Sequence, residues 1–100
     1  MFFIVLANDR EGALEARVQH RQKHLDYWKG LADVVKLGGA QLSSDQEGAP
    51  PKGSSFILEA KDLAEARALV AADPFVAEGI FSEDVRIEVL RPAIGIWLNG

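Results

Sequence analysis

The sequence has no cysteine among its 100 residues, which excludes disulfide bonds, thiolate-bound metals, iron–sulfur clusters and a cysteine nucleophile. Histidine is scarce as well, with two residues, so a zinc site would also need carboxylate ligands. The longest apolar run extends only from Met1 to Ala7, far short of the roughly 20 residues that cross a bilayer. No basic segment precedes this run, as one does in a signal peptide. We therefore expect no metal, no organic cofactor and no membrane partner.

Basic residues are outnumbered by acidic ones, since 11 Lys and Arg stand against 15 Asp and Glu and give a formal net charge of −4. This balance argues against a protein that binds nucleic acid through phosphate contacts. A hydrophobic share of 48% with 26% charged residues is typical of a globular protein and not of a disordered chain. We predict a single cytoplasmic domain over residues 1–100, with a C-terminal tail at 92–100.

The hydrophobic pattern predicts a strand at residues 2–7 that is buried on both faces, and an amphipathic helix over residues 12–30. Residues 31–37 fit either an extension of this helix or the start of a strand, and Gly38-Gly39 ends the stretch. The remaining elements are predicted as a strand at 40–43, a loop at 44–55, a strand at 56–60, a helix at 63–72, a linker at 75–81 and a strand at 85–90. Asp62 with Glu65 is an N-terminal capping pattern for the second helix.

The order β-α-β-β-α-β is typical of the ferredoxin-like α+β fold, in which two helices cover one face of an antiparallel sheet. The first strand is apolar on both faces, and the chain has no third long helix to cover the second one. We therefore expect a second subunit to pack there, giving a homodimer or a larger assembly. The tail is expected to add its apolar residues to that contact, namely Ile94, Ile96, Trp97 and Leu98.

The first predicted helix carries the candidate site, on a ridge made of Arg17, Arg21, His24 and Trp28. The ridge borders an apolar stripe of Leu14, Val18 and Leu25, so its basic groups are expected to point toward the protein, while Lys29 is placed on the opposite, polar face. The two arginines have no acidic neighbour three or four residues away and repel each other, so an anion from a ligand or from another segment would relieve the repulsion. The alternative is that these side chains simply extend to solvent from the edge of the helix.

Asp73 is the second candidate, although an Asp before Pro at a helix end is also common turn chemistry. Both helices lie on one face of the predicted sheet, so a carboxylate here can reach back to the first helix. A His24–Asp73 pair would fix the imidazole tautomer and let His24 act as a general acid/base near neutral pH. His20 and Tyr27 are interpreted as a partly exposed polar residue and a packing residue.

The sequence resembles the YCII-related proteins of the dimeric α/β-barrel superfamily. The likeness covers nearly the whole chain and rests on the apolar first strand, on R-x3-R-x2-H-L beginning at Arg17 and on D-P-F-x3-G beginning at Asp73. It implies a His–Asp active site at His24 and Asp73, with Arg17 and Arg21 as anion binders. One branch is similar to a dehydrochlorinase of a chlorinated hydroxyquinol, and the superfamily includes muconolactone isomerase. This implies acid–base chemistry on small oxygenated rings.

One segment departs from the family, which usually carries Gly-Pro after the second strand where this sequence has S-S-D-Q at residues 43–46. We predict that Ser43 and Ser44 contact the substrate at this altered pocket rim. The predicted function is a cofactor-independent lyase, of dehydrochlorinase type, or an isomerase that acts on a small anionic, aromatic-derived molecule. An alternative from another class is a sensor or accessory protein that binds a small anion without turnover, and a further one is a structural dimer module.

Overall fold

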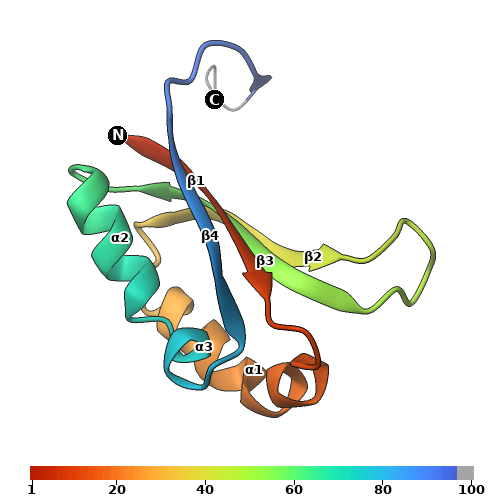
Figure 1. The fold of residues 1–100 in the computed structure, drawn as a ribbon. Coiled ribbons are helices and arrows are strands. Elements are labelled where there is room, and N and C mark those ends of the chain that lie inside the picture. Colours follow the sequence, from red (N-terminus) through yellow and green to blue (C-terminus); the bar gives the residue numbers. More distant parts are fainter. Residues whose placement is uncertain (97–100) are drawn as a thin grey trace.

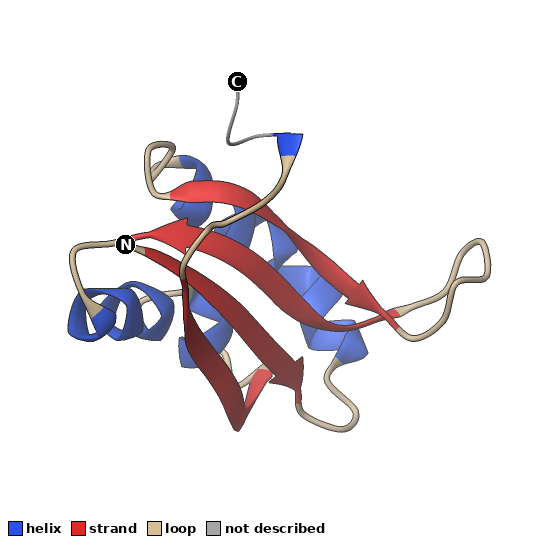
Figure 2. Ribbon diagram, turned by 90° about the horizontal axis from the view of Figure 1, so that it is seen from above, coloured by secondary structure: helices blue, strands red, loops and turns tan. Residues whose placement is uncertain are grey.

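A four-stranded antiparallel sheet carries the helices on one of its faces in the computed structural model, which describes residues 1–96 (Figures 1 and 2). The strands are β1 (Phe2–Asp9), β2 (Val35–Leu42), β3 (Pro51–Glu59) and β4 (Phe81–Leu90), in the order β2-β3-β1-β4. The helices are α1 (Leu14–Lys29), α2 (Leu63–Ala71) and α3 (Pro74–Ala77). The predicted ferredoxin-like α+β fold is thereby confirmed.

The strands are longer than predicted, because several glycines and serines that suggest turns lie inside the sheet. β2 runs through Gly38 and Gly39, and β3 begins at Pro51 within the predicted loop. A Cβ at Gly38 would lie 2.7 Å from a ring carbon of Phe56, and one at Gly53 would meet the carbonyl oxygen of Ala7. These glycines therefore allow close approach of neighbouring strands, which local turn propensity does not reveal.

The second half of the chain contains a short helix that the sequence pattern does not predict. Residues 75–81, predicted as a linker, contain most of α3 and the start of β4.

The predicted cap of α2 is confirmed, since an Asp62 carboxylate oxygen accepts a hydrogen bond from the Glu65 amide at 2.8 Å. α3 begins in a similar way, with Asp73 as its cap and proline in its first turn. No helix within residues 1–96 is long and apolar enough to span a bilayer.

Alternate side chains of β1 face the two sides of the sheet. Phe3, Val5 and Ala7 are buried beneath the helices, whereas Ile4 is only half-buried on the open face, where it pairs with Ile57 of β3. A groove of about 420 Å³ follows this open face beside β2. The open face is therefore partly apolar, as expected for a surface that meets a second subunit.

The C-terminal tail leaves the end of β4, and Figure 1 shows it rising beyond the sheet. Ile94 and Ile96 are 93% and 83% exposed, so they add nothing to the core of this chain. Trp97 and Leu98, which were also expected at a subunit contact, lie outside the described residues. The dimer remains a prediction.

Candidate functional site

The inner face of α1 carries polar and aromatic side chains. Arg17, His24 and Trp28 are buried against the sheet, whereas Leu14 and Val18 are 44% and 67% exposed. The predicted apolar stripe therefore does not form the buried face, and the ridge of basic and aromatic residues occupies that position instead. Buried hydrogen-bond partners elsewhere in the fold make this rotation of the helix possible.

His24 and Asp73 form a hydrogen-bonded pair although they lie 49 residues apart in the chain. His24 Nδ1 is 2.8 Å from Oδ1 and 2.7 Å from Oδ2 of the carboxylate, and Asp73 is only 1% exposed. The predicted contact between the two residues is present. A carboxylate beside Nδ1 accepts its proton in a hydrogen bond, which leaves the lone pair of neutral imidazole on Nε2.

Asp73 is held by two further donors. The indole Nε1 of Trp28 donates to Oδ2 at 2.7 Å, and the backbone amide of Phe75 donates to Oδ1 at 2.9 Å. Both carboxylate oxygens therefore have a donor besides the imidazole, which fixes their positions. The cap of α3 and the partner of His24 are thus one and the same side chain.

The imidazole ring is fixed by stacking as well as by hydrogen bonding. The ring of Phe75 lies parallel to that of His24, with centroids 4.0 Å apart and an interplanar angle of 5°. No hydrogen bond involves His24 Nε2 within residues 1–96, and every fully buried side-chain nitrogen or oxygen described there has a partner. Nε2 is therefore accessible from the adjoining cavity, where it can accept or donate a proton.

Arg17 is bonded within the protein. Its Nη1 donates to both carboxylate oxygens of Asp9, at 2.8 and 3.1 Å, and its Nη2 donates to Gly53 O at 2.9 Å and Ser54 Oγ at 2.7 Å. The guanidinium also lies 4.9 Å above the Phe75 ring. The anion that the sequence argument requires beside Arg17 is therefore supplied by another segment, and these four bonds leave little of the guanidinium for a ligand.

The Asp9–Arg17 ion pair is buried, and burial affects both partners. It raises the pKa of the Asp9 carboxyl, against the lowering effect of the adjacent guanidinium. It lowers the pKa of Arg17, against the raising effect of Asp9. Asp9 and Ser54 were not predicted as parts of the site. The only local signal for Asp9 is that it follows the buried strand, and the link through Ser54 depends on the pairing of β3 with β1.

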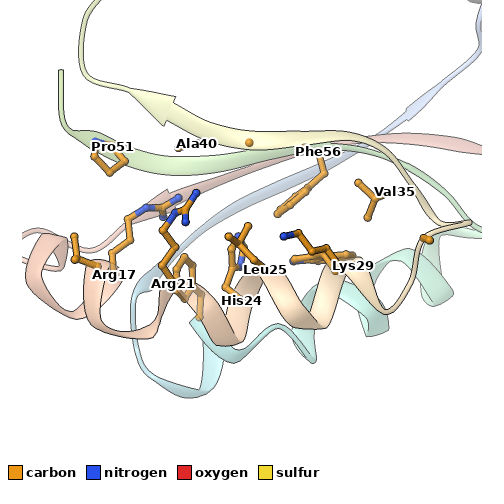
Figure 3. A pocket seen from close by; sticks show the side chains of 15 residues that line it. Arg17, Arg21, His24, Leu25, Lys29, Val35, Ala40, Pro51 and Phe56 are labelled. Carbon is orange, nitrogen blue, oxygen red and sulfur yellow. The ribbon is translucent and has the colours of Figure 1, made fainter. Parts of the chain in front are cut away.

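A cavity of about 520 Å³ lies between α1 and the strands β2 and β3 (Figure 3). Trp28, Phe56 and Phe75 supply its aromatic surface, and His24 lies among them. Gly38 and Ala40 bring the backbone of β2 to the opposite side. The cavity is large enough for a molecule of one or two rings and combines an apolar lining with a few polar groups, as ligand sites do.

Arg21 and Lys29 bring positive charge to this cavity from α1 (Figure 3). Within residues 1–96 neither forms an ion pair, and none of the described residues that line the cavity is acidic. Arg21 is where the prediction put it, in one cavity with Arg17 and His24. Lys29 was placed on the polar face and instead lines the cavity. The signal for it is the four-residue spacing of Arg21, Leu25 and Lys29, a row that turns only about 40° around the helix at each step.

The remaining candidates lie elsewhere. Ser43 and Ser44 are exposed in the loop between β2 and β3, and the cavity of this chain does not include them. His20 Nε2 lies 3.2 Å from a Glu78 carboxylate oxygen at the end of α3. Tyr27 donates its hydroxyl to the carbonyl oxygen of Leu69 at 2.5 Å, which joins α1 to α2. Across residues 1–96 no cluster of three or more His, Asp or Glu is placed to hold a metal ion.

The chain is similar to known proteins over most of its length. The profile of the YCII-related domain matches residues 1–90. The protein YciI of Escherichia coli is 34% identical over 86 residues, which cover 81% of this chain and 88% of YciI. A protein of Haemophilus influenzae is 30% identical over 88 residues, which cover 83% of this chain and 90% of the relative.

One solved structure is similar in both fold and sequence. It is the 5-chloro-2-hydroxyhydroquinone dehydrochlorinase TftG of Burkholderia phenoliruptrix, in complex with 2,5-dihydroxybenzoquinone. The two chains align with a TM-score of 0.85 at 28% identity, over 93% of this chain and 96% of TftG. The likeness therefore extends over nearly the whole of both chains.

Proposed function

The chain belongs to the YCII-related domain family, and on that premise we propose that it is a cofactor-independent enzyme of small anionic ring compounds. The reaction is an elimination or an isomerisation in which protons move and no electrons are exchanged with an external partner. His24 is the general acid/base, Asp73 is its positioning residue, and Arg21 binds an anionic oxygen of the substrate.

The observation that carries this proposal is the buried His24–Asp73 pair beside the cavity. Asp73 holds the Nδ1 proton, so Nε2 can take a proton from a bound molecule and the resulting imidazolium is stabilised by the carboxylate. The arrangement does not require a change of ring orientation, because the stacked Phe75 ring holds the imidazole in place. One imidazole can therefore remove a proton at one atom of the substrate and return it at another.

An elimination from a chlorinated hydroxyquinol shows how the step balances. Two hydroxyl oxygens lose their protons as they become carbonyl oxygens, and one proton is added to the carbon that bears chlorine. The C–Cl bond then breaks, and chloride leaves with its electron pair. The net loss is HCl, so no oxidant or reductant is needed. TftG, which is named for this substrate, supports the proposal through its similarity in fold and sequence.

The test is chloride release from 5-chloro-2-hydroxyhydroquinone by the purified protein. We expect turnover by the wild type and its loss in His24→Ala, whereas His20→Ala keeps most of the activity because His20 faces Glu78 and not the cavity. Asp73→Asn should lower kcat by about 100-fold or more, in line with the loss of an oriented proton carrier. Tight binding of this compound without release of chloride would contradict the proposal that the chain is an enzyme for it. That result would favour the alternative, a protein that binds a small anion without turnover.

We also propose that the chain acts as a cytoplasmic homodimer, with the YCII-like domain extending over residues 1–100 and the tail at the subunit contact. The support is the half-buried apolar side chains of β1 on the open sheet face and the exposed Ile94 and Ile96 of the tail. Any contact of Ser43 and Ser44 with a substrate would then depend on the assembled protein, because these residues lie away from the cavity of one chain.

A further inference from the structure

We propose that the cavity selects an elongated, flat molecule with an anionic group at each end, one bound by Arg21 and the other by Lys29. The inference rests on the proposed use of this cavity for a small anion and specifies its charge and shape. Both side chains line the same cavity and come from the same helix (Figure 3).

The first observation that supports a ligand with two anionic groups is the spacing of charged residues along α1. The side of α1 that lines the cavity places Arg17, Arg21, Leu25 and Lys29 at successive intervals of four residues. Arg17 is bonded to Asp9, Gly53 and Ser54, so Arg21 and Lys29 are the cations left for a ligand. Their backbones are about 12 Å apart along the helix axis, which suits a ring that carries a charged group on either side.

The surface between the two cations is apolar. Leu25 separates them on the helix, and the rings of Trp28 from α1 and Phe56 from β3 line the same cavity with their centroids 4.6 Å apart. A Cβ at Gly38 would meet the Phe56 ring at 2.7 Å, so the ring packs directly under the backbone of β2. A flat ring fits this apolar surface when its charged groups are directed to the two ends and any ring hydroxyl faces His24.

The reacting group falls between the two ends. His24 lies on α1 three residues after Arg21 and five before Lys29, so a molecule that spans the two cations places its central ring beside Nε2. None of the described lining residues is acidic, although the chain as a whole has a net charge of −4. The cavity is therefore a local positive site that favours an anion at each end.

The test compares binding of benzoate and terephthalate, which share a ring and differ by a carboxylate at the far end. Binding is followed by NMR through the ring signals of His24 at low ionic strength. We expect the wild type to bind terephthalate at least about tenfold more tightly than benzoate, since one further charge-assisted hydrogen bond has about that value. Phthalate, with both carboxylates on one side, should resemble benzoate.

Substitutions of Arg21 and Lys29 test which residue binds which carboxylate of terephthalate. Lys29→Gln should remove the preference for terephthalate and leave benzoate binding unchanged, because a lone carboxylate takes the bidentate guanidinium of Arg21. Arg21→Gln should weaken both. Lys23→Gln is the matched control, because this lysine lies on the same helix but faces Glu78 and does not line the cavity.

Equal affinity of the wild type for the two acids, or no binding of terephthalate at millimolar concentration, would overturn the inference. Equal weakening of both acids by Lys29→Gln would overturn it as well. Binding does not depend on turnover. A terephthalate preference without any chloride release therefore supports the two-ended site and contradicts the proposed reaction. Chloride release without a terephthalate preference supports the proposed reaction and contradicts the two-ended site.

Discussion

Asp73 combines a structural and a chemical role in one buried carboxylate. It caps α3 through the Phe75 amide, and it accepts hydrogen bonds from His24 and Trp28. A carboxylate with so many partners has one position, so the imidazole that depends on it has one orientation. The sequence indicates the partnership with His24, but not the indole donor, because the orientation of Trp28 depends on the rotation of α1.

Trp28→Phe tests the indole donor at the scale of one atom. The variant keeps an aromatic ring in the core and removes the N–H that bonds Asp73 Oδ2. We expect a loss of about 1–3 kcal/mol of unfolding free energy, measured in urea, because one donor to a buried carboxylate is lost. We also expect a lower kcat with little change in KM, since Asp73 holds His24 less firmly.

The control for this variant is Tyr27→Phe, which removes the hydroxyl that donates to Leu69 O and leaves Asp73 its donors. It should reduce the unfolding free energy without changing the tautomer of His24, read from the nitrogen NMR shifts of the ring. A Trp28→Phe protein with unchanged stability and unchanged kcat would show that the indole does not position Asp73.

Tyr27 gives a prediction for alkaline pH, and it is the only tyrosine in the sequence. Burial and the nearby Asp73 carboxylate raise its pKa above the ordinary value for tyrosine, because both disfavour the phenolate. The folded state therefore holds this proton more firmly than the unfolded chain. The stability that results is complete below the ordinary pKa and is lost as the pH rises through the raised one.

Phenolate absorbance measures this shift directly. The ionisation of Tyr27 in the native protein should occur at higher pH than in the protein unfolded by urea. Identical titration curves in the two states would contradict the contribution of burial.

The elements were easier to predict than their ends. The long helix α1 and the apolar strand β1 have strong periodicity, and both were found within a few residues of their observed bounds. β2 and β3 were predicted too short, since Gly38 and Gly53 resemble turn residues until the neighbouring strand is known. Arg17 and His24 point into the protein, as the position of their ridge indicates, but the exposure of Leu14 cannot be predicted from the helix alone, because the partners of Arg17 lie on β1 and β3.

Two adjacent glycines of β2 provide a matched experiment on this edge of the sheet. At Gly38→Ala the new Cβ meets Phe56 at 2.7 Å, whereas at Gly39→Ala nothing lies within 4 Å. We expect Gly38→Ala to cost about 1–3 kcal/mol of unfolding free energy and to weaken terephthalate binding, because Phe56 must move into the cavity. Gly39→Ala should be neutral or slightly stabilising. Equal effects of the two substitutions in urea unfolding would argue against close packing of Phe56 on β2.

The whole molecule presents two unlike sides, one covered by helices and one open. The open side carries Ile4 and Ile57 in direct cross-strand register, both half-buried. We predict a dimer through this side, with a sedimentation mass of about twice the 10.9 kDa of the chain. The two-sided apolar pattern of the first strand predicts assembly, but it does not predict which side chains of neighbouring strands share the open face, because that depends on the cross-strand register.

Ile57→Lys tests the dimer, because it places a charge in the middle of the open face. This variant should sediment as a folded monomer, with unchanged circular dichroism. Leu14→Lys is the control, since Leu14 is an exposed apolar residue on α1 in the helix layer. A wild-type protein that sediments as a monomer at micromolar concentration would contradict the predicted assembly.

The cavity lies between α1 and the sheet, so a ligand that binds there should raise the melting temperature of the protein. In most small domains this layer is filled by side chains, but here about 520 Å³ is left between them. A molecule that fills the space binds only the folded chain, and at a concentration of 100 times its Kd it adds about 2.7 kcal/mol to stability. Screening metabolites by thermal shift therefore finds candidate substrates before any product is known, and the His24→Ala protein allows them to be detected without turnover.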